Sequence, residues 1–165
     1  MKKTTKLFAA ATAIAATAAL ASASALASAS ASAAGSAEHI TVYVLRGAMG
    51  PKGPDGLGHD MFVPADFPLK VGTPVDLTIV NYDEGPHSIT SAQMGLNIMV
   101  KPGHEQADGS VTPVTTEYSF TPTKKGVFRW HCAIPCDKGG KFWAMSKDYD
   151  GPDQDGYMAG YFVVM

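Results

Sequence analysis

Residues 126–136 read GVFRWHCAIPC, and this stretch contains both cysteines of the chain. Read as a strand, it alternates between two faces, so that Phe128, Trp130 and Cys132 share one side and His131 lies on the other. The side with the two large aromatic residues must face the core, because these side chains lose the most free energy in water. The alternation therefore predicts a strand whose buried face ends at Cys132.

The two cysteines lie where this strand leaves the sheet. Pro135 cannot donate a ladder hydrogen bond, so strand pairing ends there, and Cys136 falls within the same turn. A thiol that is half inside the fold and close to backbone donors is placed to act as a sulfur ligand for a metal ion. In an exported protein a disulfide between Cys132 and Cys136 is the ordinary alternative.

The first residues have the composition of an export signal. Residues 1–6 (MKKTTK) are basic, residues 7–20 are uncharged and rich in alanine, and an Ala/Ser tract with A-x-A frames extends to residue 34. This order is typical of a secretory signal peptide, and the apolar middle is short for an uncleaved membrane anchor. We expect residues 1–36 to be a signal peptide with its Ala/Ser tract, and the product to be exported to the extracellular space, the periplasm or the cell envelope.

Composition limits the partners of residues 37–165, which suit one domain with one core. The formal net charge of the whole chain is −2 and no Lys/Arg run follows the signal, so nucleic acid and anionic membranes are poor partners. No second apolar stretch is long enough to cross a bilayer. We expect a monomer that is at most peripheral to a membrane.

Most of this domain consists of short apolar runs separated by turn residues. Residues 75–81 (VDLTIVN) alternate, with Val75, Leu77 and Ile79 facing in, and prolines within residues 61–71 indicate an edge strand. Seven or eight such strands, with no long run of helical period, indicate an all-β Greek-key sandwich or barrel. The expected strands are residues 39–45, 61–63 with 67–71, 75–81, 88–90, 96–100, 111–120, 126–132 and 161–164.

Three stretches of the domain resemble the cupredoxins, in particular the plastocyanin-like and oxidase-subunit-II-like members. They are FVPADFPLKVGTPV at residues 62–75, NYDEGPH at residues 81–87 and FTPTKKGVFRWHC at residues 120–132. The resemblance covers about residues 62–132 and the last strand. It implies a cupredoxin-like β-sandwich that binds copper.

The resemblance also implies a ligand set. Cupredoxins hold copper with an early histidine, a late cysteine, a second histidine soon after it and an axial methionine. His87 would be the first ligand, Cys132 the thiolate, and Met158, which precedes the last strand, the axial thioether. Imidazole, thiolate and a weak thioether form the blue-copper donor set.

Two departures from the family leave the type of centre open. The spacing of Cys132 and Cys136 matches the paired cysteines of the binuclear copper-A centre, so the site is either mononuclear and type 1-like or binuclear and copper-A-like. No histidine follows His131, although the family has one after the cysteine. Gln154, four residues before Met158, stands at the spacing of the missing histidine, and His131 would need a bulge to face the metal.

Other side chains that could bind metals are expected to have ordinary roles. The histidines at the domain start or in polar loops should be solvated, and the remaining methionines should pack. An acidic insertion over residues 137–157 does not match the register of a calcium loop and should also be solvated. The histidines expected to be solvated are His39, His59 and His104. The methionines expected to pack are Met94 and Met99, in the core, and Met145, against Trp143.

The resemblance implies an electron carrier, and an exported single domain without an acid/base pair fits that role. Its partner would be a redox protein such as a cytochrome or a terminal oxidase. The paired cysteines and scattered methionines also fit a copper(I) handling or delivery protein, which would exchange copper with a donor or acceptor. A metal-free sandwich stapled by a disulfide is the third hypothesis. An enzyme is not expected, because copper oxidases and nitrite reductases need further domains.

Overall fold

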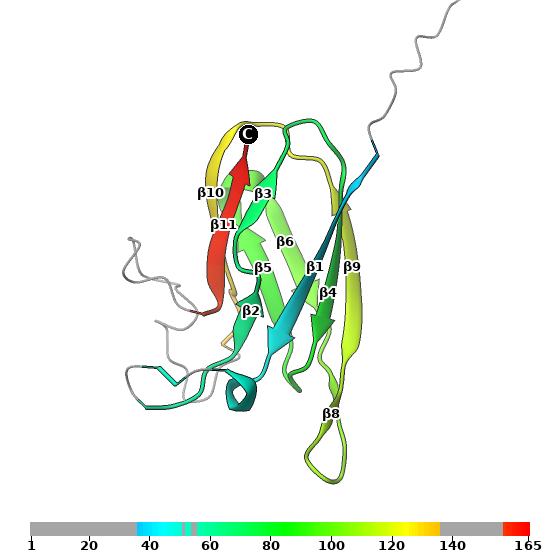
Figure 1. Ribbon diagram of the computed structural model, residues 1–165, viewed down its shortest axis with the longest axis vertical. Coiled ribbons are helices and arrows are strands. Elements are labelled where there is room, and N and C mark those ends of the chain that lie inside the picture. Colours follow the sequence, from blue (N-terminus) through cyan, green and yellow to red (C-terminus); the bar gives the residue numbers. More distant parts are fainter. Residues whose placement is uncertain (1–35, 51, 54–55, 136–156) are drawn as a thin grey trace, which may run out of the picture. The chain divides into compact units, whose positions relative to one another are not determined.

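The computed structural model describes residues 36–50, 52–53, 56–135 and 157–165. These residues form two β-sheets and a small ribbon (Figure 1). Two short 3-10 helices, η1 (Gly47–Met49) and η2 (Ala92–Met94), lie in the connections. The strands of the first sheet lie in the order β2 (Met61–Val63), β1 (Glu38–Leu45), β4 (Val75–Asn81) and β9 (Val114–Phe120). The strands of the second sheet lie in the order β3 (Phe67–Leu69), β11 (Ala159–Val164), β10 (Gly126–His131), β5 (His87–Ser91) and β6 (Leu96–Val100). The ribbon pairs β7 (His104–Glu105) with β8 (Val111–Thr112).

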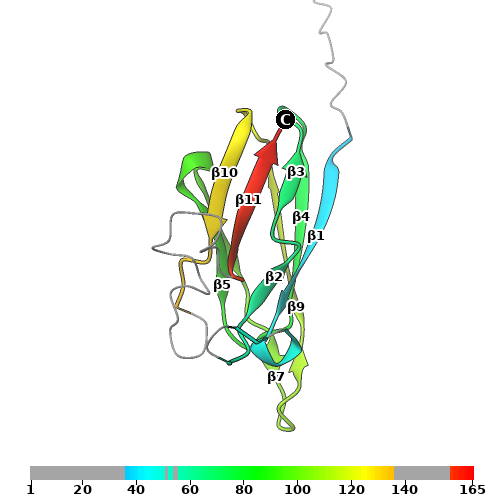
Figure 2. The same ribbon diagram turned by 60° about the vertical axis from the view of Figure 1, so that its left-hand side comes forward.

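The strand order confirms the predicted all-β Greek-key sandwich. The strands β1 and β4 run parallel in the first sheet, and β3 and β11 run parallel in the second, so the chain crosses between the sheets more than once. Figure 2 separates the two layers, with β10 and β11 on one side and β1 and β4 on the other. The expected strand over residues 111–120 is split into β8 and β9 at Pro113, which has no N–H to donate to a ladder.

The predicted alternation of core residues is confirmed in β4, where Val75, Leu77 and Ile79 are buried. It is also confirmed at the end of β10, where Trp130 and Cys132 are buried. The core lies between the sheets and contains nearly all the fully buried apolar side chains of the described residues. Burial of aliphatic and aromatic area of this kind is the main stabilising term of such a domain.

Trp130 is the central ring of this core. Its Nε1 donates to the carbonyl oxygen of Ala65 at 2.9 Å, and its ring packs against Phe62 and Phe67 at centroid distances of 5.0 and 5.8 Å. Its backbone is opposite Gly160 in the β10–β11 ladder. Because Trp130 is held by these contacts, the direction of Cys132 two residues later is fixed as well.

One prediction about the core is wrong. Met99 is 55% exposed, because Leu96, Ile98 and Val100 take the inward positions of β6 and leave Met99 on the outer face. Met94 is partly buried against the core. Within the part of the chain that the structure describes, no helix is long and apolar enough to cross a membrane.

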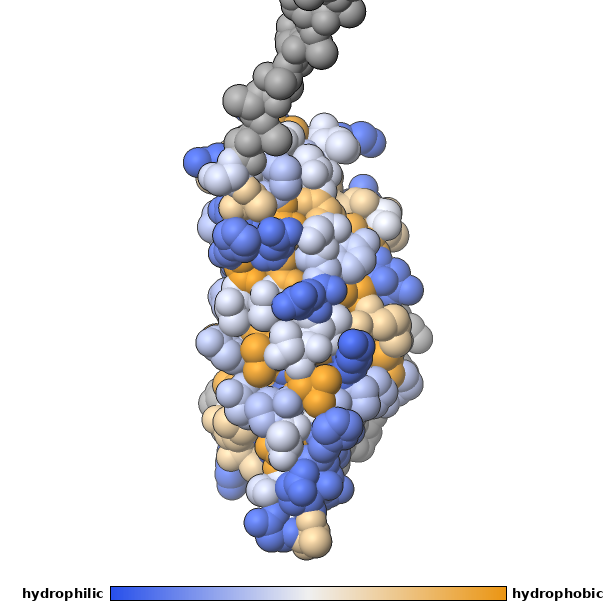
Figure 3. Space-filling view, turned by 90° about the vertical axis from the view of Figure 1, so that its right-hand side faces the viewer, coloured by the Kyte–Doolittle hydropathy of each residue, from blue (hydrophilic) through white to orange (hydrophobic). Residues whose placement is uncertain are grey.

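The outer surface of the first sheet is mixed in character. On the side of the domain that carries β9, hydrophobic residues lie in small groups between hydrophilic ones (Figure 3). This fits the burial pattern of β9, whose outward residues Thr115, Glu117 and Ser119 are exposed.

Candidate metal centre

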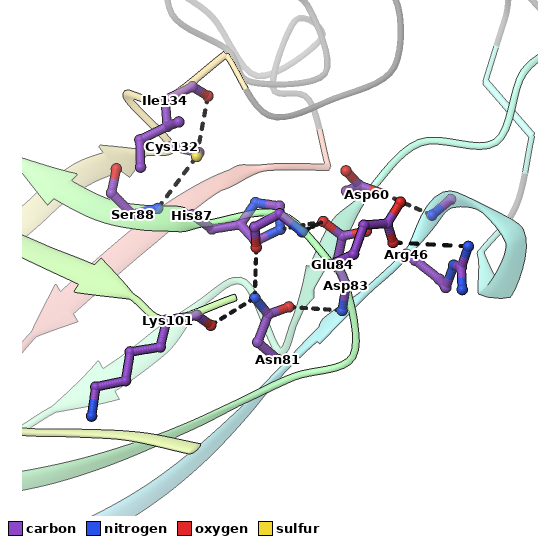
Figure 4. Close-up of polar contacts among 12 residues, drawn as sticks. Arg46, Asp60, Asn81, Asp83, Glu84, His87, Ser88, Lys101, Cys132 and Ile134 are labelled. Carbon is purple, nitrogen blue, oxygen red and sulfur yellow. Dashed lines mark hydrogen bonds and ion pairs between the residues drawn. The ribbon is translucent and has the colours of Figure 1, made fainter. Parts of the chain in front are cut away.

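The loop between β4 and β5 is held in shape by Asn81, the buried last residue of β4. The side-chain amide of Asn81 donates to the carbonyl oxygens of Gly85 and Lys101, both at 2.9 Å, and its Oδ1 accepts the Asp83 amide at 2.9 Å (Figure 4). A Cβ at Gly85 would lie 2.9 Å from Oδ2 of Asp83, so a side chain at this position would displace the Asp83 carboxylate. These hydrogen bonds therefore fix the backbone conformation of the loop that leads to His87.

His87 opens β5 and is 0% exposed. Its Nε2 lies 2.9 Å from Oδ2 of Asp83, and the same oxygen accepts the Gly85 amide at 2.9 Å. Its Nδ1 is buried and has no hydrogen-bond partner among the described residues. A buried polar atom left without a partner costs about 1–3 kcal/mol. Nδ1 is therefore the ring nitrogen of His87 whose hydrogen-bonding capacity is unused among the described residues.

His87 and Asp83 form a buried charged pair. Burial alone would lower the pKa of His87, but hydrogen bonding to Asp83 and the adjacent Cys132 raise it to about 9. Burial alone would raise the pKa of Asp83, but the His87 hydrogen bond and the Gly85 amide together hold it below its usual range. At neutral pH the metal-free pair is thus an imidazolium and a carboxylate.

Cys132 directly follows β10 and is 1% exposed. Its Sγ accepts the backbone amide of Ser88 at 3.4 Å, and the thiol donates to the carbonyl oxygen of Ile134 at 3.5 Å. The Oγ of Ser88 in turn accepts the Ala133 amide at 2.9 Å. Since Ser88 is the neighbour of His87 in β5, these bonds bring the cysteine and the histidine together, and Figure 4 shows His87 between Cys132 and Asp83.

Met158 lies beside the cysteine. Its carbonyl oxygen accepts the Cys132 amide at 2.8 Å, and its side chain is 0% exposed in the same buried cluster as Cys132. Three of the sequence-predicted site residues, His87, Cys132 and Met158, are therefore gathered at one end of the second sheet. These residues come from β5, from the end of β10 and from the turn before β11.

The other predicted residues divide into two groups. His131 pairs with Ala159 and with Thr90 in the second sheet, and its place in the alternation is opposite to that of Trp130 and Cys132. This agrees with the expectation that His131 faces away from the cysteine unless a bulge is present. Cys136 and Gln154, and with them the insertion that contains Met145, lie outside the described residues.

Two carboxylates near His87 were not singled out from the sequence. Asp60 and Asp83 are buried, and one oxygen of each lies within 4.8 Å of the other and of a ring nitrogen of His87. The Oδ1 of Asp60 also accepts the Gly47 amide at 2.8 Å. The position of Asp83 four residues before His87 is the only sequence signal for this contact, whereas Asp60 comes from a distant loop.

The expectation that His59 is solvated is wrong. His59 is 0% exposed, and its ring packs against Tyr157 at a centroid distance of 6.3 Å. His39 and His104 are exposed, as expected. His59 is buried because its loop folds back onto Gly47, a tertiary contact that the glycine-rich composition of the loop did not indicate.

A cavity lies next to the carboxylates that contact Nε2 of His87. A cavity of about 480 Å³ is lined by the glycine-rich loop and by Asp60 and Asp83. Arg46 and Glu84, also in its lining, form an ion pair with Nη2 and Oε2 3.8 Å apart. The two sides of the imidazole thus differ: Nε2 faces carboxylates near this cavity, and the rest of the ring faces the buried sulfur.

The arrangement has the donor chemistry of a transition-metal centre. An imidazole nitrogen, a thiolate and a thioether suit a soft or borderline metal ion. The Asp83 carboxylate behind Nε2 fixes the orientation of the ring, as the hydrogen-bond partners of metal-binding histidines ordinarily do. The amide of Ser88 provides a comparable hydrogen bond to the sulfur.

The chain is similar to several solved structures. A purple cupredoxin from Nitrosopumilus maritimus is 17% identical, with 76% of this chain and 98% of that chain covered and a TM-score of 0.36. A rusticyanin variant is 18% identical over 77% of this chain and 76% of that chain, with a TM-score of 0.41. A chain of a heme-copper terminal oxidase is 20% identical over 61% of this chain and 51% of its own length, with a TM-score of 0.36. No family model and no curated protein matches the sequence.

Proposed function

We propose that this domain is an exported copper protein that carries single electrons. Its copper would be held by Nδ1 of His87, the thiolate of Cys132 and the thioether of Met158. The observation that carries this proposal is the buried Nδ1 atom of His87, which has no hydrogen-bond partner among the described residues while Nε2 is bound to Asp83. A metal ion at Nδ1 would satisfy this atom, and a sulfur ligand lies beside the ring.

The residues of the chain fit copper better than a hard metal ion. Thiolate and thioether ligands favour copper, whereas magnesium and calcium require oxygen ligands. Copper held in such a set accepts and releases one electron. The protein contributes the positions of its donors, because the loop bonds of Asn81 and the hydrogen bond from the Ser88 amide are made by groups of the protein.

The burial of the centre favours a carrier over a delivery protein. His87, Cys132 and Met158 are at most 1% exposed, so they are shielded from water and from exchange with an incoming metal acceptor. A carrier needs such protection, because its donors must keep one arrangement in both oxidation states. Its partner would be a redox protein such as a cytochrome or a terminal oxidase, outside the cytoplasm.

Copper titration of the purified domain tests this proposal. We expect an intense visible thiolate-to-copper(II) band, reversible on reduction and reoxidation, that saturates as copper is added. A protein that retains copper only as colourless copper(I) would support copper handling instead. A protein that binds no copper and has no reactive thiol would support the disulfide-stapled sandwich.

The amount of copper at saturation determines the type of centre. One copper per chain supports a mononuclear type 1-like site, and two support a binuclear site in which Cys136 is the second thiolate. Replacing Cys136 by serine is the matched test, since it removes the second sulfur and leaves Cys132 in place. A mononuclear centre should keep its visible band in this variant, and a binuclear centre should lose it.

A further inference from the structure

The side chains assigned above to the metal are shielded from any redox partner. His87, Cys132 and Met158 are at most 1% exposed. Electronic coupling between two sites falls steeply with distance, and covalent bonds and hydrogen bonds carry it better than gaps do. A carrier with this centre therefore needs a short bonded path from the metal ligands to a place that a partner can reach.

One contact of His87 leads towards the solvent. Its Nε2 atom lies 2.9 Å from Oδ2 of Asp83. Asp83 in turn belongs to the lining of the cavity of about 480 Å³. Figure 4 shows the Asp83 carboxylate on the side of the His87 ring that faces away from Cys132. A single hydrogen bond thus connects the imidazole to the wall of this cavity.

A second contact of the ring leads into the core instead. Phe62 packs edge-on against His87 at a centroid distance of 6.1 Å, and Trp130 packs against Phe62 at 5.0 Å. Both aromatic rings are at most 3% exposed, so this path ends among buried side chains. Cys132 is followed by Ala133, which is exposed. The backbone after the cysteine is therefore the competing path to the surface.

The cavity has the size and the charge to receive a group of another molecule. A volume of about 480 Å³ lies within the range of ligand pockets. With a metal ion at Nδ1 the His87 ring would be neutral, so it would no longer balance the negative charge of Asp83. Carboxylates then outnumber cations in the lining, which favours a positively charged group. The carboxylates are Asp60, Asp83 and Glu84, and the cations are Arg46 and Lys52.

We propose that electrons enter and leave the centre through the hydrogen bond between His87 and Asp83, and that the cavity receives a positively charged group of the redox partner. This inference rests on the proposed copper function and deepens it, because it names the face at which the partner binds. The electron passes from the partner to copper(II), which becomes copper(I), and no covalent bond forms or breaks. Asp83 couples the ring to the partner and is not itself a metal ligand.

A paramagnetic cation tests the cavity in the metal-free protein. Hexaamminechromium(III) carries three positive charges and broadens the NMR signals of groups close to it. We expect it to broaden the backbone amide signals of Gly47 and Gly85, which line the cavity, more strongly than that of Ala133. High salt should weaken this effect. Broadening at Ala133 without broadening at Gly85 would overturn the inference, and this result does not depend on copper.

Reduction rates of the copper-loaded protein test the path itself. Three tryptophan substitutions at exposed alanines are compared. Ala48→Trp adds bulk to the lining of the cavity, and Ala133→Trp covers the competing path. Ala92→Trp is the matched control in η2, which lies at the opposite end of β5 from His87. With hexaammineruthenium(II) as the one-electron reductant, the rate should fall by about tenfold or more in Ala48→Trp and stay at the parent's value in the other two.

The visible copper band of each variant separates loss of the centre from loss of the path. It should be unchanged in all three variants. An unchanged rate in Ala48→Trp with an intact band overturns the inference, as does a rate that falls in Ala133→Trp and not in Ala48→Trp. Both of these outcomes leave the copper function standing. A parent protein without a copper band overturns the copper function on which the inference rests.

Discussion

The Nε2 atom of His87 lies 2.9 Å from Oδ2 of Asp83, and both side chains are buried at the end of the second sheet. This contact orients the imidazole. It also distinguishes the two ring nitrogens, since Nε2 is bound to the carboxylate and Nδ1 has no hydrogen-bond partner among the described residues. Metal-binding histidines commonly have such a carboxylate behind the ring, and its loss weakens metal affinity by about 10–100-fold.

Asp83→Asn tests this orientation. The amide of asparagine keeps the size of the side chain but removes the charge that stabilises the imidazolium. We expect the pKa of His87 in the metal-free protein to fall below about 9, and copper affinity to fall by about 10–100-fold. Histidine NMR titration and copper titration measure the two effects. Glu117→Gln, which changes an exposed carboxylate on β9, is the control and should change neither quantity.

The stability of the metal-free domain should depend on pH through His87. Its pKa rises from 6.5 in the unfolded chain to about 9 in the folded protein, so the folded state holds this proton more tightly. The stabilisation is therefore complete below pH 6.5 and is lost as the pH rises towards 9. The loss should be at most about 3 kcal/mol. Urea unfolding at several pH values measures it, and an equally steep loss in Asp83→Asn would contradict this assignment.

Cys132→Ser should abolish the thiolate-to-copper band and most copper binding. A hydroxyl is a poor donor for a soft metal ion at neutral pH, because it remains protonated. Visible absorbance and equilibrium dialysis under equal copper loading measure the change. Cys132 is not the metal thiolate if the variant retains the parent's colour and affinity.

His87→Ala should weaken copper binding and also destabilise the metal-free fold. The variant would leave the buried Asp83 carboxylate without its charged partner, and breaking a buried pair in this way costs about 3–5 kcal/mol. Thermal unfolding without metal should therefore occur at a lower temperature than in the parent. The double variant His87→Ala/Asp83→Ala is the control, since it removes both charges and should recover part of the loss. Unchanged copper stabilisation in the single variant would remove His87 from the site.

Gln154→His tests whether the position four residues before Met158 is open. An imidazole there would add a second nitrogen donor to those proposed for the copper, so we expect a stronger and bluer copper(II)-thiolate chromophore than in the parent. Visible and paramagnetic-resonance spectra of both proteins under equal copper loading measure the change. Identical spectra would mean that residue 154 does not face the copper.

The sequence predicted those features that depend on local alternation. Trp130 and Cys132 had to share the inner face of one strand, and the structure has them there. Met99 was placed wrongly, although the same alternation over Leu96, Ile98 and Val100 puts it outside. The prediction for Met99 followed the general tendency of methionine to be buried, although the alternation of the strand is the stronger indication.

The features that the sequence did not reveal depend on contacts between distant segments. His59 lies in a run of glycines that reads as a solvated loop, and it is buried only because Gly58 packs on Gly47. Asp60 approaches His87 through the same crossing. No periodic pattern encodes such a crossing, so the burial of His59 and the approach of Asp60 to His87 could not be predicted from the sequence.

The proposed metal site depends on the correct register between β10 and β11. His131 is opposite Ala159 and Trp130 is opposite Gly160. A slip of one residue in this ladder would turn His131 inward and Cys132 outward, and it would expose Trp130 at the same time. A misregistered chain could therefore not bring Cys132 and His87 together. With the proposed function, copper retention would report correct strand pairing, and metal binding would act as a chemical check on folding.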